Sequence, residues 1–347
     1  MPQSSREVVR RALEFDYPDR IPVELWTLPW FIEHHPREYA ALAGEFPNDI
    51  VTLPLRQRQG KRVAGDPYFS ATYTDEWGCV FENLLPGAIG EVKEPVMKEA
   101  GELDKITPPW EILPTGEERA AVLDEISRYC RSEERFVLAP ACPRLWERYQ
   151  FLRGTAEAMM DVLLEPEAFK AALDKIHDYY CAELEFWGAT AVDALQFMDD
   201  WGTQRSLLID PAVWRELIKP YYAEYREIAR RHGKYLLMHS DGCISAIYPD
   251  LVELGIDAIN SQLACMNLDE LAGCAKGKVT FRGEIDRQQV LTADDPEVGR
   301  REVRRIAEKL YTPAGGIICN FELGLGANPA TCRAVCEEWR NIGRSGK

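Results

Sequence analysis

The sequence predicts an α/β fold, a (β/α)8 barrel of the TIM type with an aromatic-rich insertion near the N-terminal strands. Eight short apolar segments recur along the 347 residues, and amphipathic stretches lie between most of them. No GxGxxG motif follows the first apolar segment, so an open, doubly wound sheet is only the second choice. We find no linker or repeat, and we therefore expect a single domain over 1–347.

The predicted strands are near-continuous apolar runs. Such runs are typical of parallel strands that are covered on both faces. The eight strands are predicted at 20–25, 49–55, 135–141, 191–198, 234–239, 256–263, 278–285 and 315–321.

The helices are predicted from apolar residues that recur with a period of 3.6 and from their end signals. Asp210 followed by Pro211 is a cap with proline in the first turn, and Gly233 ends the same helix. The predicted helices cover 4–15, 164–188, 210–233, 294–311 and 329–343. The insertion is predicted at about 56–134, where the alternation of strands and helices is interrupted by a segment rich in aromatic and turn residues.

The composition limits the classes of function. The formal net charge is −16, which argues against binding to nucleic acids or anionic membranes. No apolar run is long enough to span a membrane and no secretory signal is recognised, so we expect a cytoplasmic protein. The ten cysteines form neither a disulfide framework nor a CxxC pair.

Polar side chains gather where the predicted strands end. In a barrel, reactive groups lie at the carboxyl ends of the strands, so these residues are expected to meet at one mouth. The candidates are Asp199, Asp200, Trp201, Gln204, His239, Asp241, Asn260, Gln262, Asp286, Cys319 and Glu322.

Each candidate also has a structural interpretation. Asp199 and Asp200 could cap a helix or form a turn, but adjacent carboxylates repel each other without a partner, which favours a function. His239 alone would be an ordinary core or turn histidine. Residues i and i+2 of an extended segment project to the same side, so His239 and Asp241 can face one ion together. Glu322 could simply cap the last helix.

Several motifs together resemble one known family. They are "REVVRRALEFDYPDRIPVE", "TDEWGCVFE", "MDDWGTQRSLLIDPAVWRELIKPYY", "HSDGCISAIYPDLVELGIDAINSQ", "FRGEIDRQQVL" and "GGIICNFELGLGANPATCRAV". The combination resembles the uroporphyrinogen decarboxylase superfamily over nearly the whole chain. The resemblance implies a (β/α)8 barrel that either decarboxylates uroporphyrinogen or transfers methyl groups to or from a corrinoid protein with the help of zinc.

The methyltransferase branch is favoured. The true decarboxylases carry an "MRQAGR"-like stretch whose arginines hold substrate carboxylates, and the corresponding region, "VELWTLPWFIEHHPREY", lacks that motif. The alternatives are a metal-independent decarboxylase acting on a tetrapyrrole or a smaller carboxylate, and a non-catalytic carrier.

The resemblance also implies the ligands and partners. The family's His-x-Cys zinc motif reads His239-Ser240-Asp241 here, and its late cysteine falls near Glu322, with Cys319 close by. A zinc site of His239, Asp241 and Glu322, or Cys319, would be harder than a thiolate site and would suit a methoxy-aromatic donor. Asp199, Asp200 and His239 are the expected catalytic residues. Trp26, Trp201, Gln204, Asn260, Gln262 and Asp286 are expected to bind substrate. The expected partners are a small methyl donor and a corrinoid protein. A barrel with an aromatic-rich insertion could also form a homodimer.

Overall fold

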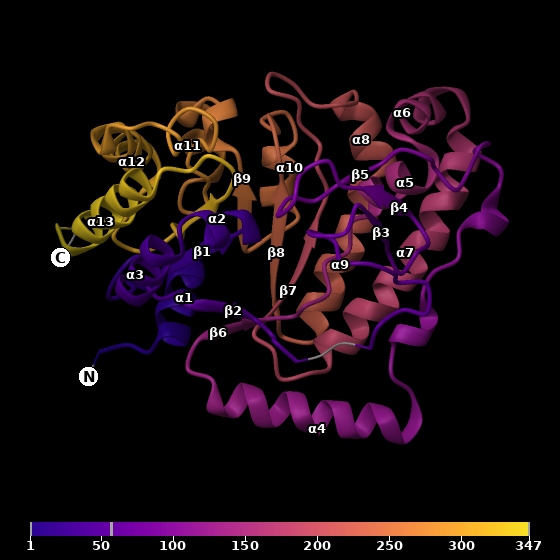
Figure 1. Ribbon diagram of the computed structural model, residues 1–347, viewed down its shortest axis with the longest axis horizontal. Helices are drawn as coiled ribbons and strands as arrows, with labels where there is room; N and C mark the ends of the chain where they lie inside the picture. The colour runs from indigo at the N-terminus through magenta and orange to yellow at the C-terminus, as the bar shows by residue number, and fades with distance from the viewer. Residues whose placement is uncertain (1, 56–57, 346–347) are drawn as a thin grey trace.

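The computed structural model describes residues 2–55 and 58–345 (Figure 1). The first two positions of the predicted insertion and the extreme ends of the predicted domain lie outside the described residues.

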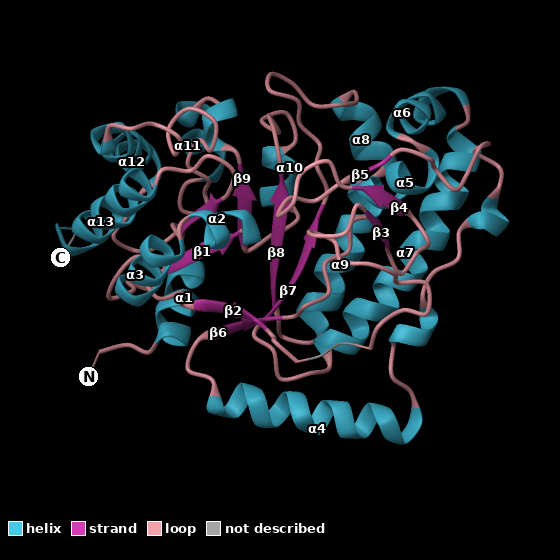
Figure 2. Cartoon of the chain, in the orientation of Figure 1, coloured by secondary structure: helices cyan, strands magenta, loops and turns pink. Residues whose placement is uncertain are grey.

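A curled parallel sheet forms the centre of the molecule, with helices around it (Figure 2). Six strands are hydrogen-bonded in the order β10-β9-β8-β7-β6-β2, and β1 pairs with β11. The parallel strands are β1 (Val23–Thr27), β2 (Ile50–Thr52), β6 (Phe136–Leu138), β7 (Ala194–Met198), β8 (Tyr235–Ser240), β9 (Ala258–Ser261), β10 (Thr280–Phe281) and β11 (Cys319–Leu323).

Backbone hydrogen bonds connect the two groups of strands. Phe281 N–H donates to Gly316 O at 2.9 Å, and Ile318 N–H donates to Phe281 O at 3.0 Å, which links β10 to the start of β11. Asp49 N–H donates to Val23 O at 2.8 Å, which links β2 to β1. The sheet therefore curls around in the manner of a TIM barrel, in agreement with the predicted fold class at this level.

An apolar layer fills the lower interior of the curled sheet. It combines side chains from the strands with Val9 and Leu13 of helix α1 (Ser5–Glu14), which lies across this end of the sheet. The strand residues of the layer are Ile50, Phe136, Leu138, Ala194, Leu237, Ala258 and Ile318. Apart from Thr280, whose hydroxyl donates to Ala12 O of α1 at 3.1 Å, the polar groups described below lie above this layer, toward the carboxyl ends of the strands.

Three aspartates, each directly before a strand, accept a hydrogen bond from a backbone N–H at or near the start of a neighbouring strand. Asp49 Oδ2 accepts from Val23 N–H at 2.8 Å, and it also pairs with Arg20. Asp193 Oδ2 accepts from Val137 N–H at 2.7 Å, and Asp257 Oδ2 accepts from Leu236 N–H at 2.8 Å. These backbone N–H groups have no carbonyl partner in the sheet, and the carboxylates accept their hydrogen bonds. All three contacts lie at the end of the barrel opposite the mouth.

Helices surround the sheet. Four of the five predicted helices differ from the observed ones only by one or two residues at their ends, and further helices, such as those at Pro29–His34 and Pro36–Glu45, lie outside the predicted ranges. The predicted helix over 210–233 is two helices, broken at Ile218, because Pro220 cannot donate the hydrogen bond that a continuous helix would need. The remaining helices are α2 (Pro29–His34), α3 (Pro36–Glu45), α4 (Gly116–Ser132), α5 (Leu145–Arg153), α6 (Thr155–Leu164), α7 (Pro166–Gly188), α8 (Pro211–Leu217), α9 (Lys219–Arg231), α10 (Tyr248–Glu253), α11 (Leu268–Ala275), α12 (Pro296–Leu310) and α13 (Pro329–Ser345), with short 3-10 turns at Leu103–Lys105, Trp110–Ile112 and Leu263–Cys265. Among the described residues, no helix combines the length and apolar character that crossing a membrane requires.

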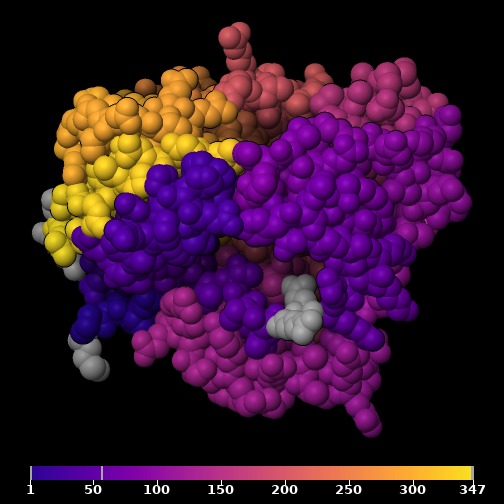
Figure 3. Space-filling model, in the orientation of Figure 1, coloured from indigo at the N-terminus to yellow at the C-terminus, as the bar shows by residue number. Residues whose placement is uncertain are grey.

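The segment between β2 and β6 forms a small antiparallel sheet followed by α4. Its strands are β3 (Thr72–Thr74), β4 (Val80–Glu82) and β5 (Glu91–Val92). Phe81 packs edge-on against Phe151 of α5 at 5.2 Å between ring centroids, and Trp77 packs against Tyr179 of α7 at 5.3 Å. Figure 3 shows this purple segment as a broad surface beside the adjoining indigo and yellow ends of the chain.

Candidate active site

Side-chain alternation along the strands places Asp200, His239 and Asp241 on the inner side of the sheet. Leu237 belongs to the interior apolar layer, so His239 and Asp241, two and four residues later, continue on the same face. Ala194 in β7 is also interior, and Asp200 follows it at an even spacing. The three side chains therefore meet at the carboxyl ends of β7 and β8.

Asn260 fixes the orientation of the His239 ring. Its Nδ2 donates to Arg282 O at 2.7 Å and to Asn320 Oδ1 at 2.8 Å. Because both amide protons are used, its Oδ1 is an acceptor, and it contacts His239 Nδ1. His239 Nδ1 therefore carries a proton, and its other ring nitrogen, Nε2, is directed to the carboxylates. The sequence predicted Asn260 to bind substrate, but it is fully buried in the interior and acts on the histidine.

Two carboxylates face the free nitrogen of His239. Asp200 Oδ1 lies 3.4 Å and Asp241 Oδ1 lies 3.6 Å from Nε2. One ligand-capable atom from each of the three residues lies within 4.8 Å of the others. Asp241 Oδ1 is buried and has no hydrogen-bond partner. Zinc commonly binds imidazole nitrogen and carboxylate oxygen, and the unpaired Asp241 Oδ1 is free to act as a ligand, so these residues are suitable for a zinc ion.

The charges of this group shift its pKa values in opposite directions. Burial lowers the pKa of His239, but the hydrogen bond and charge of Asp200, together with Asp241 and Glu284, outweigh it and raise the pKa to about 9. Burial also favours the protonated form of Asp200, but His239 holds the pKa of Asp200 below its usual value. When no other cation is present, the neighbouring carboxylates therefore favour a proton on His239.

Two buried glutamates at the mouth were not found from the sequence. Glu284 follows β10 on the interior face, and both of its carboxylate oxygens are buried without a hydrogen-bond partner. Burial raises the pKa of Glu284 to about 7, and burial likewise raises that of Glu147 in α5 to about 7. Arg282 binds Glu24 inside the barrel. Glu284 follows two residues later, so the alternation of side chains along a strand could have predicted that it also points inward. Glu147 lies on a helix outside the strand pattern and left no sequence signal.

Glu322 is not part of the three-residue group. Arg287 contacts Asp241 Oδ2, and its Nη1 lies 3.9 Å from Glu322 Oε2, so the guanidinium group lies between the two carboxylates. The ion pair of Arg287 uses Oδ2 of Asp241 and leaves Oδ1 facing His239.

Cys319, predicted as a possible metal ligand, points away from the mouth group. Cys319 is 1% exposed, and its thiol lies close to that of Cys336 of α13. Asn320, its neighbour in β11, points into the interior, where it contacts Asn260. Because side chains alternate along a strand, Cys319 must face the surrounding helices.

Asp199 and Trp201 also point away from the mouth, so their predicted roles at the reacting groups are not supported by their positions. Asp199 is completely buried, and it accepts hydrogen bonds from the Tyr222 hydroxyl and from Glu147 N–H. Trp201 stacks on Trp146 at 5.0 Å, and its Nε1 donates to Tyr222 Oη at 2.8 Å. These residues hold β7 against the helices and thereby position Asp200.

The other predicted substrate-binding residues lie around the mouth. Trp26 of β1 packs against the His239 ring at 5.4 Å, with the Arg282 guanidinium over its own face at 5.0 Å. Gln204, Gln262 and Asp286 line a hollow of about 120 Å³ together with Glu284 and Arg287. Gln262 Oε1 also accepts from Gly242 N–H at 3.0 Å, which secures the turn after His239.

A larger cavity of about 630 Å³ opens between the end of β6 and the segment that carries β3 and β4. Aromatic, basic and acidic residues line it, among them Trp77, Tyr179, Arg144 and Glu183. Arg148, which also lines it, is neutralised by Asp75. Arg144 has weaker partners: its Nη2 donates to Met198 Sδ at 3.0 Å, and its Nη1 lies 3.9 Å from Glu147. Arg144 is therefore available to an anionic ligand next to Glu147.

Comparison with solved structures supports the fold. A methyltransferase from Methanosarcina mazei superposes with a TM-score of 0.70 at 12% sequence identity, covering 98% of this chain and 99% of that chain. A B12-independent methionine synthase from Shewanella sp. superposes with a TM-score of 0.44 at 11% identity, covering 67% and 70% of the two chains. At these values only the first similarity supports a conclusion, and it concerns the fold alone.

Sequence comparison identifies the family. No curated protein matches the sequence at a significant level. The model of the uroporphyrinogen decarboxylase (URO-D) family matches residues 84–341, which is well over half of the chain and includes β6 to β11 with the group around His239. The chain therefore belongs to the uroporphyrinogen decarboxylase family.

Proposed function

We propose that the protein is a methyltransferase that moves a methyl group between a small donor and a corrinoid carried by a partner protein, with a zinc ion held by Asp200, His239 and Asp241. The observation that carries the proposal is the convergence of these three side chains, with Asn260 directing His239 Nε2 at the carboxylates. The fold shared with the Methanosarcina mazei methyltransferase is compatible with this activity.

Zinc would supply a Lewis acid for the heteroatom that bears the methyl group. The chain's own residues supply the remaining requirements of the reaction. Burial raises the pKa of both Glu284 and Glu147, so either carboxyl is suited to hold a proton and donate it to the departing oxygen or nitrogen. Such a proton offsets the negative charge that develops on a poor leaving group.

The cavity beside the mouth suits an aromatic donor with a negative charge. Its aromatic lining can cover a ring, and Arg144 can pair with a carboxylate on the donor. A methoxy-aromatic carboxylate is therefore the donor class that we propose. The corrinoid would approach from solvent, because the mouth group is the part of the interior that opens outward.

The test combines metal analysis with a transfer assay. Purified protein is analysed for zinc, and methoxybenzoates are offered with cob(I)alamin as the acceptor, whose methylation is followed by its absorbance. We expect one zinc at the mouth and transfer to cobalamin; in His239→Ala the zinc content should fall by about one per chain, and transfer should be lost. Unchanged turnover in His239→Ala would remove the mouth group from the mechanism.

Decarboxylation of a small carboxylate is the second candidate, because Arg144 could bind the carboxylate of such a substrate equally well. It requires no metal, and Glu147 or Glu284 would protonate the carbon that loses carbon dioxide. Release of carbon dioxide by a chelator-treated, zinc-free preparation would favour this reaction over methyl transfer.

A further inference from the structure

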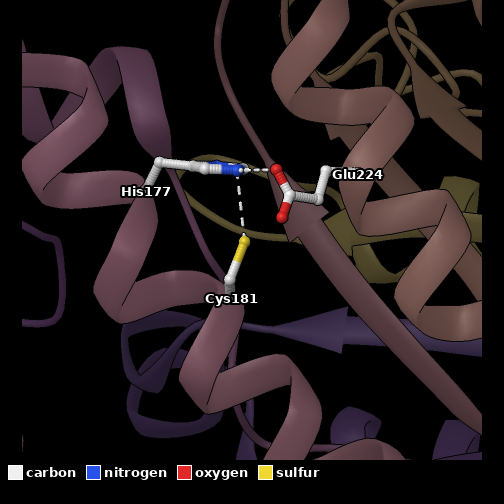
Figure 4. Close-up of side chains that lie close together, drawn as sticks. All are labelled: His177, Cys181 and Glu224. Carbon is white, nitrogen blue, oxygen red and sulfur yellow. Dashed lines mark hydrogen bonds and ion pairs between the residues drawn. The ribbon is translucent and has the colours of Figure 1, made fainter.

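A second group of ligand-type side chains lies between helices α7 and α9, outside the sheet. His177 and Cys181 are one turn apart on α7, and Glu224 faces them from α9 (Figure 4). His177 Nε2 lies 2.8 Å from Glu224 Oε2 and 3.1 Å from Cys181 Sγ. The three side chains point toward one another (Figure 4), and their ligand atoms lie within 4.8 Å of one another.

Both contacts converge on the same ring nitrogen, and this distinguishes the group from a nucleophilic triad. In a triad the acid binds one ring nitrogen and the nucleophile binds the other. Here Nε2 has a single proton or a single lone pair to share between Glu224 and Cys181. Burial, reinforced by the Glu224 charge, also raises the pKa of the Cys181 thiol, so it is no activated nucleophile.

The surroundings hold the histidine rigidly but leave one side open. The His177 ring packs against Tyr221 at 4.7 Å and Tyr225 at 5.0 Å between ring centroids. Its side chain is 7% exposed, whereas that of Glu224 is 58% exposed. His177 Nδ1 is buried without a hydrogen-bond partner, so aromatic packing sets the ring orientation. An ion from solvent can therefore reach a preformed nitrogen ligand past Glu224.

We propose that His177, Cys181 and Glu224 form a binding site for a divalent transition metal of the zinc class, separate from the mouth group, which fastens α7 to α9. Nitrogen, sulfur and oxygen ligands are the set that zinc accepts, and water would complete a tetrahedron. On binding, the Cys181 sulfur releases its proton to solvent and donates its electron pair to the metal.

The observed separations are close to those such a site requires. Zinc–ligand bonds of about 2.0–2.3 Å in a tetrahedron place ligand atoms roughly 3.3–3.6 Å apart. The two contacts of His177 Nε2, at 2.8 and 3.1 Å, are shorter by about half an ångström. Small rotations of Cys181 and of the half-exposed Glu224 side chain would open the required space.

Cobalt(II) is the probe, because thiolate coordination gives it a charge-transfer band that nitrogen and oxygen ligands do not give. The full-length chain, freed of metal, is titrated with Co²⁺ alone. We expect the band in the wild type and its loss in Cys181→Ser. It should persist in Cys265→Ser, the cysteine nearest the mouth hollow, and in Cys274→Ser, a partly buried cysteine of α11.

Two further variants keep the result decisive if Cys181→Ser folds poorly. Glu224→Gln changes a half-exposed side chain, so folding should be preserved, and we expect at least a tenfold weaker Co²⁺ affinity. In His239→Ala the band should remain, because the mouth group contributes no sulfur. The absence of a band in the wild type, its survival in Cys181→Ser, or an unchanged affinity in Glu224→Gln would each overturn the proposal.

Discussion

His239 Nδ1 donates its proton to Asn260 Oδ1, and this contact decides what the histidine can bind. The amide of Asn260 cannot turn around, because its Nδ2 is held by Arg282 O and Asn320. Nε2 is thus the ring nitrogen that remains for a cation between Asp200 and Asp241. A polar network inside the barrel therefore prepares the site before any ligand arrives.

Asn260→Ala should weaken metal binding at the mouth without removing a ligand. The ring of His239 would lose its orientation and its preferred tautomer, so zinc affinity should fall about 10- to 100-fold. Competition with a chromophoric chelator measures this affinity, in a Cys181→Ser background that removes the second proposed site. Asn267→Ala is the matched control, since Asn267 only caps α11 at the surface and its loss should leave zinc binding unchanged.

Cys319→Ala should leave the zinc content unchanged, because this thiol faces α13 and contacts Cys336. The free energy of unfolding should fall by about 1 kcal/mol, which is typical of a small loss of packing in a core. Metal analysis and urea denaturation of the same preparation test both statements. Loss of zinc with stability intact would show that Cys319 reaches the metal after all.

Arg144→Gln should raise KM for carboxylated donors and leave their kcat nearly unchanged. A charge-assisted hydrogen bond contributes about 1.5–3 kcal/mol, so KM should rise by roughly 10- to 100-fold. Steady-state assays with a methoxybenzoate and with its uncharged methoxybenzene counterpart separate the effect, since the uncharged donor should respond little. Arg305→Gln, on the surface of α12, is the control. Equal changes for both donors would contradict a carboxylate contact.

Glu183→Gln should alter the dependence of stability on pH. Burial, with the charge of Glu76 added, raises the pKa of Glu183 from 4.5 to about 8, so between these values the folded state holds a proton that the unfolded state has released. The wild type should therefore lose stability as the pH rises through this window, and Glu183→Gln should lose less. The urea midpoints of both proteins at pH 5 and pH 8 measure this difference in stability loss. Solvent in the adjoining cavity screens Glu183 and will make the difference smaller. Parallel curves for the two proteins would show that Glu183 is ionised throughout.

Asp49→Ala should destabilise the end of the barrel opposite the mouth. Asp49 is 1% exposed, and its loss leaves Val23 N–H and Arg20 without their acceptor. We expect the free energy of unfolding to fall by about 2–3 kcal/mol. Asp124→Ala is the control, because the Asp124–Arg128 pair is largely exposed and its loss should change stability by less than about 1 kcal/mol.

The fold class and the polar character of the strand ends could be predicted from the sequence, because both depend on local patterns. Apolar runs and their spacing indicated the parallel strands, and His239 with Asp241 was recognised from a spacing of two residues. The same alternation could have separated Asp200, which points inward, from Asp199, and it could have added Glu284 and rejected Cys319. These are consequences of strand geometry that the sequence already contained.

Other features depend on contacts between distant segments. The sequence carried no sign that Arg287 would lie between Asp241 and Glu322, or that Glu147 of α5 would be buried beside Asp199. Nor could the spacing of His177 and Cys181 reveal that Glu224, on another helix, completes their group. The sequence by itself determined the strands and the face that each side chain occupies. Only the tertiary structure decided which charges became neighbours, because neighbouring charges are set by how strands and helices pack in space.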